Sequence, residues 1–219
     1  DFSASSGDFK KTVTFGVYQN KPKIYTDNQN KPAGIFIDII KKTAEKENWN
    51  INFISCKWPE CIEMTKSGKI DIMPDVAVSN ERKKYFDFNE EVVLESWTRI
   101  YSGDDLSGES FSALKNKKIA VLKDSIQKEI LEQILKGLKF EYEILEAETF
   151  DKAFQLVANK TADTAAVNHF FGNYYYSDYG LKKTAIVFNP SKLYFATAKN
   201  KNSDVLKAID KHLYKMKNS

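Results

Sequence analysis

Cysteine is scarce in this sequence: only two of the 219 residues are cysteines, Cys56 and Cys61, and both lie in the segment CKWPEC. A zinc site would need a second pair of cysteine or histidine ligands, and the segment offers none, so we expect no metal. Two interpretations remain. The thiols are either free and at least partly buried, or they form a small disulfide between a strand end and a helix start, which requires an oxidising compartment.

Long apolar runs are also absent. No stretch approaches the roughly 20 apolar residues that cross a bilayer, and no signal peptide is recognisable. We therefore expect a mature or excised soluble piece. Its 219 residues suffice for a proper core in one large domain or two small ones, and two lobes are our working prediction.

An excess of one charge is missing as well, since 33 Lys and Arg are balanced by 30 Asp and Glu. The lysines are spread along the chain, which argues against nucleic acid as the main partner. The sequence has no Gly-x-Ser-x-Gly, no His-Glu-x-x-His and no phosphate loop. His169 and His212 have no metal-ligating neighbour at helical spacing, so we interpret both as bystanders and expect no cofactor.

The sequence does contain an alternation of strands and helices. In the first half, apolar spacing predicts strands at 12–17, 50–55 and 70–74, and helices at 35–49 and 59–67. Pro59 suits a first helical position, and Gly68 suits a helix end. An extended piece at 95–103 is followed by DDLSGES, residues 104–110, which is the best candidate linker.

The second half repeats this pattern. We predict strands at 117–123, 139–145 and 162–168, a helix at 125–136 ended by Gly137, and a helix at 149–160 capped by Thr149. The segment ADTAAVN mirrors IDIMPDV, because each has an Asp as its second residue and a polar residue at the strand exit. This weak repeat implies two similar α/β lobes.

The tail from residue 192 predicts a strand and then an amphipathic helix that packs back on the first lobe. Its apolar stripe consists of Val205, Ile209, Leu213 and Met216. The chain would then cross between lobes twice, near 101–104 and 191–196. We predict lobe 1 as residues 1–102 plus 196–219, and lobe 2 as residues 103–195.

Two charged residues follow the apolar strand at 70–74. Asp75 stands at its exit, and Arg82 lies in the first turn of a short helix that begins at Ser79. Ligands of α/β sheets bind outside the carboxyl ends of strands, and clefts between lobes are common pockets. Arginine offers a planar fork of donors that matches a carboxylate. The alternative for Arg82 is a surface charge in a lysine-rich turn.

Several segments, taken in order, resemble one family over nearly the whole chain: FGVYQNKP, GIFIDII, SGKIDIMPDVAVSNERKKYFDF, KKIAVLKDSIQ, TADTAAVNHFF and LYFATAK. They are similar to extracytoplasmic solute-binding proteins for polar amino acids, the type II periplasmic binding proteins or Venus flytraps. Within that family, DIMPDVA, AAVNHFFG and LYFATAK look most like the sensor domains of membrane histidine kinases and diguanylate cyclases. The resemblance implies a two-lobed α/β fold with two hinge crossings.

The resemblance also implies roles for individual residues. Arg82 would clamp the ligand carboxylate, and Trp58 would cover the ligand side chain, although core packing beside Pro59 is an alternative for Trp58. Tyr18 would come from the exit of the first strand. Ser125 and Gln127 would come from the turn that opens the second lobe's helix, where backbone N–H groups suit anions.

Three positions depart from the family's pattern. Asn168 stands where amino-acid binders usually have an aspartate for the ligand's ammonium group, and Asp75 stands where they usually have a small hydroxyl or apolar residue. Asp75 would either take over the ammonium or neutralise Arg82. Asn20 replaces a second stacking aromatic. These departures leave two ligand classes open, an ordinary amino acid and another small carboxylate.

Other residues have competing interpretations. Trp97 either lines the pocket near the hinge or fills the first lobe. Asp71 and Asp163 are more consistent with structural caps than with ligand contacts. The run NYYYSDYG, residues 173–180, reads as a mixture of packing and surface aromatics, because adjacent tyrosines cannot all face one side of a helix.

The function that these observations predict is an extracytoplasmic sensor domain, tethered to the inner membrane in the full-length protein. Its lobes would close on an amino acid or small carboxylate and signal to a membrane-bound module of the same polypeptide. The first alternative is a stand-alone binding protein that delivers solute to an ABC permease. The second is a dehydratase-like enzyme with the same fold. Asp75 is the only residue that the sequence places in the cleft as a candidate general acid or base.

Overall fold

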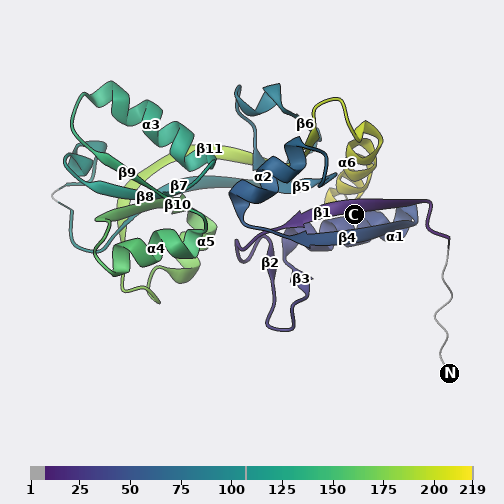
Figure 1. The fold of residues 1–219 in the computed structure, drawn as a ribbon, viewed down its shortest axis with the longest axis horizontal. Helices are drawn as coiled ribbons and strands as arrows, with labels where there is room; N and C mark the ends of the chain where they lie inside the picture. Colours follow the sequence, from purple (N-terminus) through teal and green to yellow (C-terminus); the bar gives the residue numbers. More distant parts are fainter. Residues whose placement is uncertain (1–7, 107, 219) are drawn as a thin grey trace.

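The computed structural model describes residues 8–106 and 108–218, which form two α/β lobes side by side (Figure 1). Lobe 1 contains β1 (Lys11–Val17), β2 (Tyr25–Thr26), β3 (Pro32–Ala33), α1 (Ile35–Glu47), β4 (Trp49–Ser55), α2 (Trp58–Lys66), β5 (Met73–Ala77), η1 (Arg82–Lys84), β6 (Phe86–Phe88) and α6 (Ser203–Lys217). Lobe 2 contains η2 (Phe111–Leu114), β8 (Lys118–Leu122), α3 (Ile126–Leu138), β9 (Glu143–Ala147), α4 (Phe150–Ala158), β10 (Thr164–Asn168) and α5 (His169–Tyr175). Two long strands, β7 (Leu94–Ser102) and β11 (Lys182–Ala198), serve both lobes.

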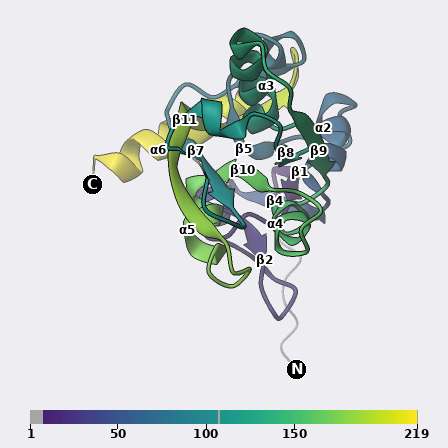
Figure 2. The same ribbon diagram turned by 90° about the vertical axis from the view of Figure 1, so that its left-hand side faces the viewer.

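The strands of lobe 2 continue into those of lobe 1. A seven-stranded sheet runs in the order β5-β11-β7-β10-β8-β9, with β6 added on β11. In lobe 2, β10, β8 and β9 are parallel, and the α3 helix covers one face while α4 and α5 cover the other (Figure 2). In lobe 1, β1 and β4 are parallel, and Phe15 bridges Ile72 beside them. The carboxyl ends of both groups of parallel strands therefore lead to the region between the lobes.

The register of β7 shows where the chain crosses. Residues 98–102 already pair with β10 of lobe 2, from Asn168 opposite Thr98 to Thr164 opposite Ser102. On β11, Lys182–Phe188 pair with that same part of β7, whereas Leu193 pairs with Ala77 of β5. The boundaries at 102/103 and 195/196 remain a prediction, but this pairing favours crossings near residues 94–97 and 189–193.

The predicted linker 104–110 follows the crossing instead of forming it. Ser107 lies outside the described residues. Around it, the Gly103 N–H donates to the Asp163 carbonyl at 3.2 Å, and Lys182 pairs with Asp105 at 2.9 Å. Both contacts tie the segment to lobe 2 and its end of β11.

Most predicted elements are present, with shifted ends. The helix predicted to stop at Gly137 continues through it and ends at Leu138. The next residue, Lys139, is its C-cap and has a left-handed φ of 53°. As a consequence β9 begins at Glu143, later than predicted. The Thr149 cap of α4 is confirmed, since its side chain accepts the Lys152 N–H at 3.0 Å.

The predicted stripe of α6 packs as expected. Val205, Ile209 and Leu213 are buried, and Met216 is partly buried, with α6 lying over α1 of lobe 1. Both repeat aspartates act structurally. The carboxylate of Asp71 accepts bonds from the backbone and hydroxyl of Thr14, and that of Asp163 accepts the Lys118 N–H.

Candidate functional site

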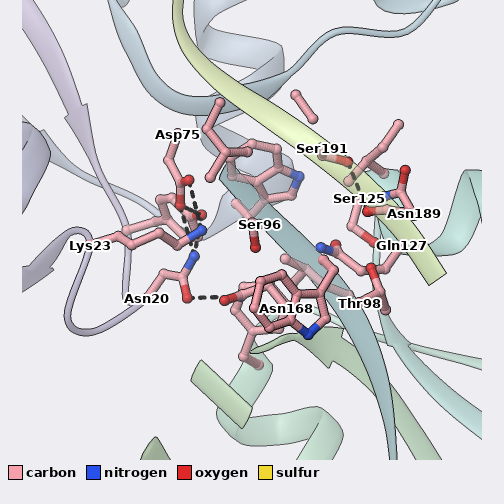
Figure 3. Close-up of a pocket in the computed structure, with 18 of the residues that line it drawn as sticks. Asn20, Lys23, Asp75, Ser96, Thr98, Ser125, Gln127, Asn168, Asn189 and Ser191 are labelled. Atoms are coloured by element: carbon pink, nitrogen blue, oxygen red, sulfur yellow. Dashed lines mark hydrogen bonds and ion pairs between the residues drawn. The ribbon is translucent and has the colours of Figure 1, made fainter. Parts of the chain in front are cut away.

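A cavity between the lobes brings together every residue predicted for the site. Its lining includes Tyr18, Asn20, Trp58, Asp75, Arg82, Trp97, Ser125, Gln127 and Asn168. The lining also includes polar residues that the sequence reasoning missed, among them Lys23, Ser96, Thr98, Asn189 and Ser191 (Figure 3). The cavity thus draws on the turn after β1, the starts of α2, η1 and α3, and the strands β5, β7, β10 and β11.

Asp75 is held by three donors at the lobe 1 end of the cavity. Lys23 Nζ lies 2.8 Å from Oδ1, while the Tyr18 hydroxyl and Asn20 Nδ2 donate to Oδ2 at 2.6 and 2.8 Å. The side chains of Lys23 and Asp75 are 3% and 0% exposed, so this ion pair is shielded from water. Lys23 therefore neutralises Asp75, and neither of the two alternatives considered for Asp75 included this partner.

The turn after β1 explains how a lysine enters the core. The Asn20 N–H donates to the Ile24 carbonyl at 2.8 Å, and the Lys23 N–H donates back to the Asn20 carbonyl at 3.0 Å. The Lys23 carbonyl accepts the N–H of Phe36 at 3.1 Å. A side chain at Gly34, with φ at 109°, would lie 2.5 Å from that carbonyl. Glycine thus permits α1 to approach the turn. No simple pattern distinguishes Lys23 from the many surface lysines of this sequence.

Burial sets the protonation of this cluster. The pKa of Tyr18 is raised well above its ordinary value, mainly by burial and then by the neighbouring Asp75 carboxylate. Burial lowers the pKa of Lys23, while the Asp75 carboxylate opposes that change. Tyr18 therefore remains a neutral donor, and the pair of Lys23 with Asp75 carries no net charge.

Arg82 is the second buried cation of the cavity. Its Nη1 donates to the Ala77 carbonyl at 2.9 Å and its Nη2 to the Asp124 carbonyl at 3.2 Å, so it contacts both lobes. Within the described residues no carboxylate forms an ion pair with it. Burial lowers the pKa of Arg82 to about 10, which leaves the guanidinium charged at neutral pH. The Ser79 hydroxyl accepts the Arg82 N–H at 3.2 Å, as predicted for the start of this turn.

Trp58 contacts both Arg82 and the turn that precedes α3. Its ring centroid is 5.5 Å from the guanidinium carbon of Arg82 and 4.8 Å from the ring of Tyr18. Its indole N–H donates to the Asp124 carbonyl at 3.0 Å. Ser125 caps α3 by accepting the Lys128 N–H at 3.2 Å. Trp58 therefore packs in the core and lines the cavity at once.

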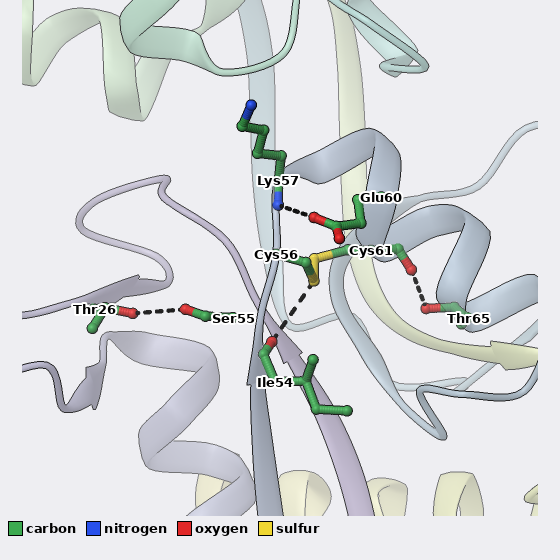
Figure 4. The surroundings of a disulfide bond; sticks show 8 residues. All are labelled: Thr26, Ile54, Ser55, Cys56, Lys57, Glu60, Cys61 and Thr65. Atoms are coloured by element: carbon green, nitrogen blue, oxygen red, sulfur yellow. Dashed lines mark hydrogen bonds between the residues drawn. A yellow bond between two sulfur atoms is a disulfide. The ribbon is translucent and has the colours of Figure 1, made fainter.

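Cys56 and Cys61 form a disulfide, with their Cα atoms 5.4 Å apart (Figure 4). Of the two interpretations of these cysteines, the disulfide is therefore the correct one. The bond joins the residue after β4 to the first turns of α2. Trp58 lies inside this short loop. The disulfide thus constrains the segment that carries an aromatic residue of the cavity.

Asn168 links the lobes through its amide. Its Nδ2 donates to Asn20 Oδ1 at 3.0 Å, and its Oδ1 accepts the Phe171 N–H at 3.0 Å as the cap of α5 (Figure 3). Since Asn20 also donates to Asp75, a chain of hydrogen bonds runs from lobe 1 to lobe 2 across the cleft. Asn20 therefore contributes polar contacts where the resemblance suggests a missing aromatic.

Trp97 and His169 form a stacked pair at the edge of the cavity. Their rings are 3.5 Å apart with planes 4° from parallel, and His169 Nδ1 accepts the Trp97 N–H at 3.2 Å. Trp97 is 42% exposed, so it lines the cavity and does not fill lobe 1. His169 therefore packs against Trp97, a contact that the sequence did not indicate. His212 pairs with Glu47 at 2.7 Å on α1, away from this site.

The opposite side of the cavity is polar but uncharged. Thr98 Oγ1 is buried and has no hydrogen-bond partner among the described residues. Gln127, Asn189, Ser96 and Ser191 also line the cavity. In the described residues no group of His, Cys, Asp and Glu side chains could hold a metal ion. The arrangement can thus receive an anion at Arg82 and neutral polar groups beside Thr98.

Comparison with known proteins gives a family match. The family of bacterial extracellular solute-binding proteins, family 3, matches residues 13–219. No curated protein matches the sequence. These family proteins bind solutes and are not enzymes, which removes the dehydratase-like alternative.

Three solved structures share the fold at a TM-score of 0.84. An ancestral arginine-binding protein bound to arginine is 26% identical, with 95% of this chain and 93% of that chain covered. A histidine kinase sensor domain with similarity to periplasmic binding proteins is 21% identical, with 96% and 91% covered. A putative L-cystine ABC transporter protein from Listeria monocytogenes is 19% identical, with 94% and 90% covered. The chain therefore has the periplasmic binding protein type II fold.

Among the described residues, no helix combines the length and the apolar character needed to span a bilayer.

Proposed function

We propose that this chain, which belongs to the bacterial extracellular solute-binding proteins of family 3, is the ligand-binding domain of an extracytoplasmic sensor. It closes on a small polar solute that carries a carboxylate. The observation that carries the proposal is Arg82, a buried guanidinium that faces the cavity and has no carboxylate partner in the described part of the chain. A buried cation without a counter-ion is costly, and a ligand carboxylate would supply one.

Contacts across the cleft support a closing mechanism. Trp58 and Arg82 of lobe 1 both donate to the Asp124 carbonyl of lobe 2, and Asn168 donates to Asn20. A ligand that touches both lobes stabilises the closed arrangement by its differential affinity for it. The strands β7 and β11 connect the lobes and are the natural site of the hinge.

The amino acids named for similar proteins share one chemical group with the solute proposed here. Ancestral arginine-binding proteins in the comparison were solved with arginine and with glutamine, at 26% and 25% identity to this chain. Each of these ligands has an α-carboxylate, the group that Arg82 would receive.

The sensor role has a serious rival in ABC transport. A histidine kinase sensor domain supports the first, and a putative L-cystine ABC transporter protein supports the second. The segments DIMPDVA, AAVNHFFG and LYFATAK favour the sensor. A membrane-spanning helix encoded directly after Ser219, which would tether the domain to the inner membrane, supports the sensor. A stop codon there, with a lipoprotein signal upstream, supports delivery to a permease.

Substitution of Arg82 tests the binding function. A thermal-shift screen with amino acids and small carboxylates identifies a ligand, because binding to the folded state raises the melting temperature. Calorimetry with that ligand should show that Arg82→Ala weakens binding by about 2 to 5 kcal/mol, since a charge-assisted contact in a desolvated cleft is lost.

Lys83→Ala is the matched control, because Lys83 is the exposed neighbour of Arg82 on η1. It should bind like the unmodified protein. Near-normal affinity of Arg82→Ala would mean that the ligand binds elsewhere.

A further inference from the structure

We propose that the ligand is a small monocarboxylate without an ammonium group, because Lys23 already occupies the position that a ligand ammonium would take on Asp75. The ligand's far end is neutral and polar. This inference rests on the proposed function and specifies the chemical class that the same cavity receives.

The charged side chains that line the cavity favour a ligand with a single negative charge. Asp75 is its one carboxylate among the described lining residues, and Lys23 and Arg82 are its cations. Lys23 and Asp75 neutralise each other at 2.8 Å, which leaves the charge of Arg82. A monoanion makes this cavity neutral. A zwitterion brings an ammonium as a third cation into a shielded space where Lys23 already pairs with Asp75, the one carboxylate among the described lining residues. An unpaired buried ammonium is strongly unfavourable.

The hydrogen bonds of Asp75 leave no free position for a ligand ammonium. Its Oδ1 accepts from Lys23, and its Oδ2 accepts from both Tyr18 and Asn20. A ligand ammonium could bind Asp75 only after displacing one of these donors. Lys23 is 2% exposed and belongs to a turn closed by backbone hydrogen bonds, so its displacement would leave another ammonium buried and unpaired.

Among the described residues that line the cavity, lobe 2 supplies no carboxylate. Asn168 lies opposite Asp75 across the cleft, but its amide is neutral and already bridges Asn20 and the Phe171 N–H. The other polar groups nearby are the Thr98 hydroxyl, which lacks a partner in the described residues, and the side chains of Gln127, Asn189 and Ser191. These groups suit a hydroxyl or carboxamide on the ligand.

Matched pairs of compounds test the inference on the unmodified protein. The members of a pair share one carbon skeleton and differ at the α-carbon. Glutamine is compared with glutaramate, and alanine with propionate, which lack the ammonium group. Alanine is also compared with lactate, in which a hydroxyl replaces it. Calorimetry should show that the tightest carboxylate binds about tenfold or more tightly than its amino acid, a difference of roughly 1.4 kcal/mol. An amino acid that binds as tightly as its partner, or more tightly, overturns the inference.

Variants at Lys23 separate its role from general packing. Lys23→Ala frees Asp75 and should raise the affinity for the amino acid of the pair, so that the preference narrows or reverses. The double variant Lys23→Ala/Asp75→Asn removes both charges of the pair, and should keep the preference for the carboxylate. If Lys23→Ala does not fold, the double variant decides, since a gain in amino-acid affinity there would contradict the role of Asp75.

The outcomes distinguish this inference from the proposed function. The protein could instead bind amino acids more tightly than the matched carboxylates and lose this binding in Arg82→Ala. That result overturns the proposed ligand class but supports the proposed binding function. Failure of every compound in both classes to bind, or binding that ignores Arg82→Ala, contradicts both. A folded Lys23→Ala variant with unchanged ratios contradicts the inference alone.

Discussion

Asp75 and Arg82 lie in the same region of lobe 1, but their side chains have different kinds of partners. Asp75 accepts hydrogen bonds from Lys23, Tyr18 and Asn20. The guanidinium of Arg82 instead donates to two carbonyl oxygens and lies over an aromatic ring. The φ of Asp75 is 62°, a left-handed conformation that costs energy in a residue other than glycine. We interpret that backbone geometry as part of what directs its carboxylate to Lys23.

The stacked pair of Trp97 and His169 gives a prediction at the residue scale. Burial lowers the pKa of His169. The Trp97 carbonyl, 3.4 Å from Nδ1, opposes this change because it can accept a hydrogen bond from a protonated Nδ1, while the charges of Lys23 and Arg99 lower the pKa further. Below its ordinary pKa of about 6.5 the unfolded chain therefore binds more protons than the folded one, and stability falls as pH falls.

Urea unfolding at pH 7.5 and 5.5 measures this effect. The unmodified protein should lose more free energy of unfolding across that interval than His169→Gln, which cannot titrate there. Equal losses in the two proteins would show that the stack does not disfavour the protonated ring.

At the scale of elements, the disulfide fixes the loop between β4 and α2. Replacement of both Cys56 and Cys61 by alanine should lower the free energy of unfolding by about 2 kcal/mol, because the cross-link restricts the unfolded chain over only a short loop. It should also weaken ligand binding, since Trp58 lies inside this loop and bonds to Asp124. Denaturant titration and calorimetry measure the two effects.

A reducing agent provides the control for this prediction. It should lower the stability of the unmodified protein and leave the alanine variant unchanged. Unaltered stability after full reduction would mean that the bond adds nothing to the fold.

The elements also show what the sequence could predict. Apolar spacing located the helices and most strands, because their buried faces follow regular periods. Gly137 misled the prediction of a helix end, because α3 buries Leu131 and Leu135 and simply continues through an exposed glycine. Tertiary packing, not local propensity, decided that boundary.

The site was predicted where a residue type has one dominant use. Arg82 at the start of η1 and Trp58 at the start of α2 both line the cavity, as the resemblance implied. Lys23 was missed because its burial depends on a turn and on the approach of Gly34, which no periodicity encodes. The unpartnered Thr98 hydroxyl was missed for a similar reason, since its environment comes from pairing between β7 and β10.

At the scale of the whole molecule, the two lobes are in contact in this structure. One cluster of buried apolar residues contains Phe15 and Phe36 of lobe 1 together with Phe154 and Phe171 of lobe 2. Polar contacts from Trp58, Arg82 and Asn168 cross the same boundary. In a sensor, this closed arrangement would place α6, at the end of the chain, in a defined position relative to the membrane.

Small-angle X-ray scattering tests closure most directly. The domain is measured without ligand, then with the carboxylate that gives the largest thermal shift, and Arg82→Ala is measured at the same concentrations. We predict that the ligand reduces the radius of gyration of the unmodified protein toward the value of this structure, and that Arg82→Ala stays expanded. Saturating ligand that leaves the radius of gyration unchanged from that of an extended, ligand-free protein would contradict closure around the solute.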